Sequence, residues 1–284
     1  MSIFKLDPAF KDYIWGGTRL RDEYGKKCDY DKVAESWELS CHKDGPSVVA
    51  DGEYKGLTLN EYIEKAGKGV LGKNCERFEN FPILIKLIDA KDNLSVQVHP
   101  DNDYAMRVEG EYGKTEMWYV VDCDEGATLL YGFKHEITKE EFARRIADNT
   151  LLEVTNAVPV KKGDVFFIKS GTLHAIGKGI LIAEIQQNSN TTYRIYDYGR
   201  VGKDGKPREL HVDKALDVTK LAPAEQYPET PVEKKDGYDI KLLSKCEYFT
   251  TYRVNVETKA ELDADENSFN SILVLEGEPE IGRA

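Results

Sequence analysis

The chain has 284 residues and a formal net charge of -12 at pH 7. This negative balance argues against binding to nucleic acid or to an anionic membrane, and an anionic substrate would have to be held by a few local lysines and arginines. The N-terminal residues carry no apolar signal segment, and the five cysteines are scattered, with no Cys-x-x-Cys pair. Both features favour a cytoplasmic protein with free thiols.

The hydrophobic pattern predicts short strands separated by turns, with a few helices between them. The strands and helices do not alternate regularly, so a doubly wound parallel sheet is not expected. Short β-branched and aromatic runs bounded by Gly, Asp and Asn are typical of a sandwich or barrel. In chain order, we expect a helix at 58–66, strands at 81–88 and 94–98, a helix at 101–108, strands at 117–121 and 128–132, a helix at 138–148, strands at 151–154, 165–169, 180–186 and 191–196, and a helix at 212–219.

A loop rich in Pro and Glu at 223–231 indicates a domain boundary. We expect a first domain at 1–225, which contains the helical insertions, and a second, smaller β domain at 226–284. Strands are predicted in the second domain at 240–243, 249–256 and 268–275. Because the chain ends soon after the last of these, we expect this domain to be shortened, which leaves its completeness open.

Four polar side chains stand out beside apolar strands. Gln97 and His99 share one face of the strand at 94–98, because strand residues alternate between faces. His174 follows the strand at 165–169, and Glu116 opens the strand at 117–121. Each has a plainer interpretation: a solvent-facing strand surface for Gln97 and His99, a hydrogen-bonded loop position for His174, and an exposed strand end for Glu116.

Together, these four side chains offer two imidazoles, a carboxylate and an amide oxygen. If their strands converge inside one barrel, the set suits a divalent cation with open coordination positions. No thiolate is present, so the ligand types alone do not choose among Zn²⁺, Fe²⁺ and Mn²⁺.

The segment at 163–174 resembles the second sequence motif of the cupin superfamily. Gly163, Gly171 and His174 match three fixed positions of that motif, whereas Lys169 and Lys178 stand where Pro and Asn are usual.

The first cupin motif is altered as well. It reads Gln97-Val98-His99, and Glu116 follows only after a long insertion. This altered form resembles the type I mannose-6-phosphate isomerases, in their short bacterial form. Further segments that resemble the family, in its order, are 13–17, 81–86, 97–100, 113–116 and 171–177, followed by Glu184 and Tyr193-Arg194.

The resemblance implies a mainly β fold with a cupin-type barrel, or jelly roll, and makes 1–225 the catalytic domain. It also implies one zinc ion per chain, held by Gln97, His99, Glu116 and His174, although Fe²⁺, Mn²⁺ and Co²⁺ stay open. The implied reaction interconverts mannose 6-phosphate and fructose 6-phosphate through a cis-enediol. Arg194 is the expected catalytic residue, since a guanidinium can brace an enediolate or clamp a phosphate; its plainer interpretation is an arginine on a surface strand.

Three more residues are candidates for substrate binding. Lys86 lies within an apolar strand, where a lysine is costly unless it faces a polar cavity. Lys114 shares a strand face with Glu116, and Glu184 shares one with Ile182 and Gln186. The plainer interpretations are lysines whose stems cover apolar surface and a solvated glutamate.

Two other functions fit the same residues less well. Two histidines and a carboxylate also occur in cupin Fe²⁺ dioxygenases, but the nearby cations suit a phosphorylated substrate better. A non-catalytic, metal-containing sugar-phosphate binding protein is the other alternative. The pattern singles out no proton-transfer base and gives no oligomeric state.

Overall fold

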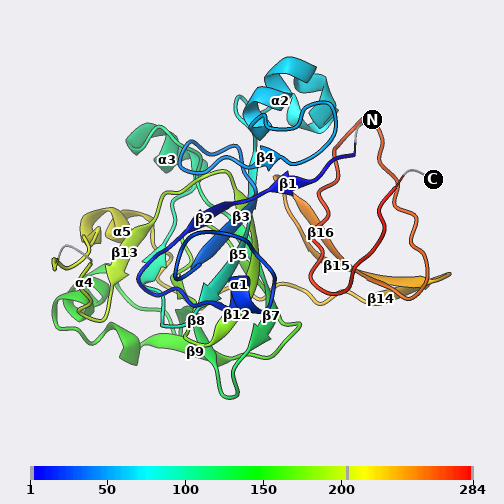
Figure 1. The fold of residues 1–284 in the computed structure, drawn as a ribbon. Helices are drawn as coiled ribbons and strands as arrows, with labels where there is room; N and C mark the ends of the chain where they lie inside the picture. The colour runs from blue at the N-terminus through cyan, green and yellow to red at the C-terminus, as the bar shows by residue number, and fades with distance from the viewer. Residues whose placement is uncertain (1–2, 203–204, 283–284) are drawn as a thin grey trace. The chain divides into compact units, whose positions relative to one another are not determined.

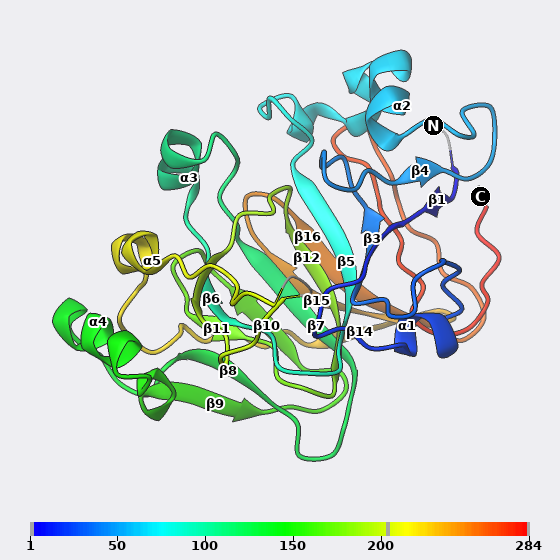
Figure 2. The same ribbon diagram turned by 60° about the vertical axis from the view of Figure 1, so that its left-hand side comes forward.

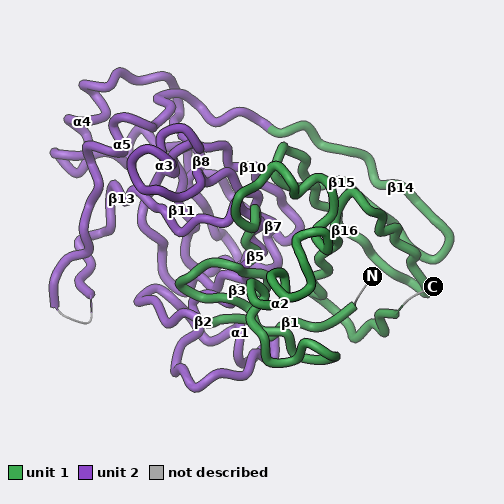
Figure 3. The backbone as a smooth tube through the Cα atoms, turned by 90° about the horizontal axis from the view of Figure 1, so that it is seen from above, with its two compact units in different colours: residues 1–9, 37–85, 227–284 green, residues 10–36, 86–226 purple. Residues whose placement is uncertain are grey.

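The computed structural model describes residues 3–202 and 205–282 (Figure 1). These residues form two compact units (Figure 3). Unit 1 comprises the described residues within 1–9, 37–85 and 227–284, and unit 2 those within 10–36 and 86–226. The expected division into domains at 1–225 and 226–284 stays a prediction.

Most of the strands of unit 2 belong to two sheets. One has six strands in the order β10-β7-β12-β5-β3-β2, and the other has five in the order β13-β6-β11-β8-β9. The six strands are β2 (Ala9–Lys11), β3 (Glu35–Leu39), β5 (Ile83–Ala90), β7 (Glu116–Cys123), β10 (Val165–Ile168) and β12 (Ile180–Gln187). The five are β6 (Val96–Val98), β8 (Thr128–Phe133), β9 (Thr155–Pro159), β11 (His174–Ala175) and β13 (Tyr193–Tyr196). The boundary between the units falls within β2, β3 and β5.

The interior of unit 2 changes from apolar to polar along neighbouring strands. On β12 and β7, Ile182 pairs with Val120, Glu184 with Trp118, and Gln186 with Glu116. Cross-strand partners share a face, so these side chains form three successive rows. The apolar row and Trp118 belong to a core that also includes Trp15, Leu129, Ile168 and Ile180. The polar end of the rows is available for a site.

A second core packs the outer face of the five-stranded sheet against helices. Helices α3 (Asn102–Val108), α4 (Lys139–Ala147) and α5 (Val212–Val218) lie on this side in both ribbon views (Figures 1 and 2). Phe142 of α4 and Ala215 of α5 are fully buried in that core. The α4 helix begins where expected, because the Thr138 side chain accepts a hydrogen bond from the Glu141 backbone N–H. Unit 2 also contains the short helices α1 (Arg19–Asp22) and η3 (Leu151–Glu153).

Unit 1 contains two smaller sheets and one longer helix. Strands β1 (Leu6–Asp7) and β4 (Val48–Val49) pair with each other, and β14 (Val232–Lys235), β15 (Tyr238–Lys245) and β16 (Thr250–Val256) form a meander in the order β14-β15-β16. Helix α2 (Leu59–Ala66) opens with a capping box between Thr58 and Glu61. The 3₁₀ turns η1 (Lys68–Leu71) and η2 (Lys73–Cys75) follow it. Within 3–202 and 205–282, no helix combines the length and apolarity needed to cross a membrane.

The predicted fold class and most predicted elements are confirmed. The structure is mainly β with short helices, and the four expected helices form within one residue of their predicted bounds. Two predicted strands are wrong. The predicted strand at 151–154 is replaced by η3 (Leu151–Glu153), which follows α4 after a short turn and places Leu151 in the outer core. Residues 268–275 form no strand, since their backbone pairs with no strand among the described residues.

Candidate metal centre

Three strands of the five-stranded sheet align polar side chains in one row. His174 on β11 is the register partner of Gln97 on β6, and Gln97 is also the partner of Arg194 on β13. Their side chains therefore share a face. The opposite face carries the apolar neighbours Val98 and Tyr193, which are buried in the outer core. Alternation along short strands thus brings Gln97, His174 and Arg194 together.

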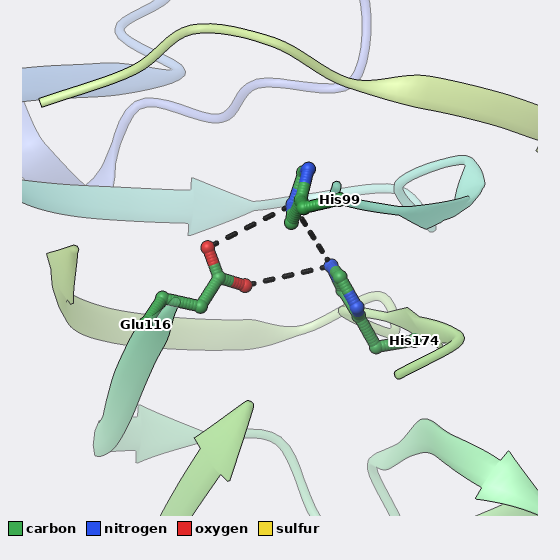
Figure 4. A group of neighbouring side chains, drawn as sticks. All are labelled: His99, Glu116 and His174. Carbon is green, nitrogen blue, oxygen red and sulfur yellow. Dashed lines mark hydrogen bonds and ion pairs between the residues drawn. The ribbon is translucent and has the colours of Figure 1, made fainter. Parts of the chain in front are cut away.

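The fourth candidate ligand comes from the other sheet. Glu116 is the first residue of β7, and it converges with His99 and His174 (Figure 4). The two histidine Nε2 atoms are 3.1 Å apart. The Glu116 carboxylate lies 3.4 Å from Nε2 of His174 and 3.8 Å from Nε2 of His99. All three residues are at most 1% exposed.

The donor atoms are arranged as a cation requires. His99 Nδ1 lies 2.9 Å from the carbonyl oxygen of Thr191, and His174 Nδ1 lies 2.8 Å from that of Thr172. A carbonyl can only accept, so each Nδ1 carries the proton and each Nε2 keeps its lone pair for a metal. Both oxygens of Glu116 are buried, and the Lys114 ammonium lies 2.8 Å from this carboxylate and 3.2 Å from Nε2 of His99. These residues therefore fit a bound divalent cation.

Gln97 lies beside this group through its amide. Its nitrogen is 3.4 Å from Nε2 of His174, and its oxygen is 3.4 Å from the hydroxyl of Ser95. Half a turn of the amide would bring the oxygen toward the three ligands, because the two amide atoms have nearly the same shape. Gln97 is thus placed to supply a fourth donor.

Burial sets the protonation states of the three ligands. It lowers the pKa of His174 to about 4 and that of His99 well below 6.5, so both imidazoles are neutral near pH 7. The Glu116 pKa shifts the other way. Burial, followed by the nearby Glu184 carboxylate, raises it to about 7 despite the opposing effect of Lys114 and Lys86.

A chain of buried opposite charges leads away from the ligands. The Lys114 ammonium is 2.8 Å from Glu116 and 3.7 Å from Glu184, and the Lys86 ammonium is 3.4 Å from Glu184 and 3.5 Å from Glu35. Burial opposes the charge on Lys86, but Glu35 and Glu184 outweigh it and raise the lysine pKa. Burial also opposes the charge on Glu184, yet the two lysines lower its pKa overall. Both side chains therefore stay ionised.

Arg194, like Gln97, is partly exposed, whereas the other predicted site residues are buried. Its side chain donates to the carbonyl oxygen of Glu209 at 3.0 Å, while its buried Nε has no hydrogen-bond partner. Burial and the neighbouring guanidinium of Arg208 lower its pKa below the ordinary arginine value, but an arginine stays cationic in proteins. A guanidinium with an unused donor, next to Gln97 on the inner face, is available to an anionic ligand.

Known proteins resemble the chain along most of its length. A family model described as the catalytic domain of type I phosphomannose isomerase matches residues 3–126. A mannose-6-phosphate isomerase of Bacillus subtilis, ManA, is 42% identical, with 95% of this chain and 84% of the relative covered. One from Streptococcus mutans is 44% identical, covering 84% and 74%. The chain belongs to the mannose-6-phosphate isomerase family.

A solved member of the family also matches the fold. The crystal structure of the mannose 6-phosphate isomerase from Bacillus subtilis has a TM-score of 0.85 and 40% identity, with 90% of this chain and 81% of that chain covered. This match confirms the expected cupin fold. Membership of the mannose-6-phosphate isomerase family supports a metal cofactor for the group of His99, Glu116 and His174. It does not favour the dioxygenase or the non-catalytic binding protein.

The sequence analysis did not select two buried residues of this family member as candidate site residues. Glu35 is 7% exposed and forms the far end of the charge chain. Its sequence signal is weak, because Ser36 and Glu38 are also polar and the segment does not stand out as Lys86 does within its apolar strand. Gln186 is fully buried beside Glu116, and the alternation that selected Glu184 selects it equally.

Proposed function

We propose that the chain catalyses the interconversion of mannose 6-phosphate and fructose 6-phosphate with one zinc ion bound per chain. The observation that carries the proposal is the convergence of His99, Glu116 and His174 in a chain whose relatives are named mannose-6-phosphate isomerases. Zinc would be held by these three residues and by Gln97, because imidazole, carboxylate and amide donors suit it. Fe²⁺, Mn²⁺ and Co²⁺ accept the same donors.

The reaction moves a proton between C1 and C2 of the open-chain sugar, and negative charge develops on oxygen in the cis-enediol. A bound divalent cation would supply Lewis-acid stabilisation of that charge. Arg194 is the proposed catalytic residue. Its guanidinium lies in the same row as Gln97, so it can donate hydrogen bonds to the oxygen that becomes negative.

The buried charges are proposed to bind the rest of the substrate. Lys86 and Lys114 present ammonium groups that suit phosphate or hydroxyl oxygens. One oxygen of Glu184 accepts a hydrogen bond from the Trp118 indole N–H at 2.8 Å. This bond fixes the carboxylate, and its other oxygen, near both lysines, can accept a hydrogen bond from a sugar hydroxyl.

We also expect the chain to work in the cytoplasm. All five cysteines, Cys28, Cys41, Cys75, Cys123 and Cys246, are free thiols, which suits a reducing compartment.

The test is a coupled assay on protein that has been stripped with EDTA and then reloaded with Zn²⁺. Zinc should restore conversion of mannose 6-phosphate to fructose 6-phosphate. Arg194→Ala should lower turnover about 100-fold or more at unchanged zinc content, the size of loss expected for one donor to a developing negative charge. The matched control is Arg107→Ala, on the exposed side of α3, which should leave turnover unchanged.

Two outcomes would oppose the proposal. Folded wild-type protein that binds metal but shows no turnover with Zn²⁺, Mn²⁺, Fe²⁺ or Co²⁺ would overturn the isomerase assignment. If Arg194→Ala lost zinc and activity in equal measure, the arginine would act on the metal site and the catalytic role would be wrong.

A further inference from the structure

The orientation of His99 depends on a backbone carbonyl in the loop after β12. Thr191 supplies that carbonyl, and it accepts the Nδ1 proton of His99 at 2.9 Å. This hydrogen bond leaves Nε2 unprotonated and points it at Glu116 and His174. The acceptor is main chain, so its position depends on whatever holds residues 187–191.

Two buried side chains hold this loop. The Gln186 amide nitrogen donates to the carbonyl oxygens of Gln187 and Ser189, at 2.7 and 2.6 Å. The Ser189 hydroxyl accepts a hydrogen bond from the Thr191 backbone N–H at 3.2 Å. Gln186 and Ser189 are both 0% exposed, so water does not compete for these bonds. Three hydrogen bonds, joined through the covalent structure of Ser189 and Thr191, thus connect Gln186 with His99.

The Gln186 amide can point in only one direction. Both partners of its nitrogen are carbonyl acceptors, so a flipped amide would set oxygen against oxygen. Its own oxygen is buried and accepts no hydrogen bond from the described residues. Leaving a buried acceptor without a partner is costly. The two bonds donated by the amide nitrogen therefore fix the orientation of the side chain, although its oxygen is left without a hydrogen bond.

The starting point of this path lies beside a second ligand. Gln186 is the register partner of Glu116 across β12 and β7, so their Cβ atoms are about 5 Å apart. Gln186 therefore packs beside Glu116 and also holds the 187–191 loop, whose Thr191 carbonyl orients His99.

We propose that Gln186 and Ser189 are positioning residues of the metal centre, which fix the Thr191 carbonyl and through it the Nε2 atom of His99. This inference rests on the metal centre of the proposed function. Loss of a group that orients a metal-binding histidine typically weakens metal binding 10- to 100-fold. The effect should appear in metal affinity itself, before any substrate is added.

The experiment measures zinc affinity of metal-free protein by competition with a chromophoric chelator. Gln186→Met keeps the side-chain volume but removes both donors, and it should weaken zinc binding about 10- to 100-fold. Ser189→Ala removes the acceptor for Thr191 and should weaken binding in the same direction, by less. The control Gln226→Met places the same substitution at an exposed position of unit 2 and should bind zinc like the wild type.

A second measurement separates positioning from general destabilisation. Each protein is loaded with Co²⁺, whose visible absorption depends on ligand geometry, at a temperature well below its unfolding transition. A changed spectrum in Gln186→Met and Ser189→Ala, with an unchanged one in Gln226→Met, supports the inference. Wild-type zinc affinity and spectrum in both folded variants would overturn it, and Ser189→Ala alone decides if Gln186→Met does not fold. Failure of the wild type to bind zinc would overturn the metal centre, and with it the proposed function.

Discussion

At the metal centre, competition from protons falls on a single residue, Glu116. Its pKa is raised to about 7, by burial first and by Glu184 second, so the carboxyl group must lose a proton to bind metal in mildly acidic solution. The pKa of His174, about 4, and that of His99, well below 6.5, keep both imidazoles neutral there. We predict that zinc affinity of the metal-free protein falls about tenfold for each pH unit between pH 6.5 and 5, and levels off above pH 8.

The measurement is the chelator competition repeated from pH 5 to 8.5, with the chelator's own protonation taken into account. Glu116→Gln is the matched control, because it keeps the shape and removes the titrating group. This variant should bind zinc more weakly, with little dependence on pH in the same range. A slope of two protons in the wild type would mean that the histidines titrate as well, and a flat profile would mean that Glu116 is already ionised.

At the scale of elements, the two-residue strand β11 carries His174 and depends on a close backbone approach just after it. A Cβ atom added to Gly177 would lie 1.7 Å from the carbonyl oxygen of Thr128, at the start of the neighbouring strand β8. Neither backbone can yield without disturbing the pairing of β11 with β8. Gly177→Ala should therefore lower the free energy of unfolding by about 2–4 kcal/mol.

Urea unfolding of the metal-free protein measures this loss. Gly69→Ala is the control, since a Cβ there meets nothing within 4 Å and the backbone is not left-handed. The control should unfold within about 0.5 kcal/mol of the wild type. Equal stability of the two variants would show that the contact at Gly177 relaxes freely.

Helices and strands with a clear hydrophobic period in the sequence were predictable. Elements that depend on pairing with a distant strand were not. Alternation on β12 placed Ile182, Glu184 and Gln186 on one face, as the register with β7 confirms. Short strands such as β11 and β2 have too few residues to show a period. Residues 268–275 have strand composition, but a strand also needs a neighbour to accept its hydrogen bonds, and composition does not supply one.

The candidate site was predictable to a similar extent. Gln97, His99, Glu116 and His174 were selected as polar residues beside apolar strands, and the convergence of the last three is now visible in the fold. Glu35 was missed because its partner, Lys86, is 51 positions away in the sequence. Pairing over such a distance follows from strand order in the sheet, which the sequence pattern does not contain.

At the scale of the whole molecule, metal binding would give the site a charge opposite in sign to the overall charge. The chain carries a net charge of -12, whereas the buried cluster has two ammonium groups (Lys86, Lys114) against three carboxylates (Glu35, Glu116, Glu184). A divalent cation would change the cluster from -1 to +1 when all five groups are ionised. Bound metal would thus make the interior of unit 2 attractive to an anionic substrate, even though the molecule as a whole repels it at long range.

The positions of the proposed ligands predict which part of the molecule metal binding stabilises. Every proposed ligand lies in unit 2, on or next to β6, β7 and β11. A ligand that binds only the folded state stabilises it by about 2.7 kcal/mol when its concentration is 100 times its dissociation constant. We predict that zinc slows hydrogen exchange of the amides in these three strands by about 10- to 100-fold. Strands β15 and β16 of unit 1 carry no ligand, so their amides should exchange at the same rate with and without metal. Mass-spectrometric exchange on EDTA-treated and zinc-loaded protein tests this. Equal slowing across both units would mean that metal binding stabilises the chain as one cooperative structure, and an effect confined to β15 and β16 would place the metal elsewhere.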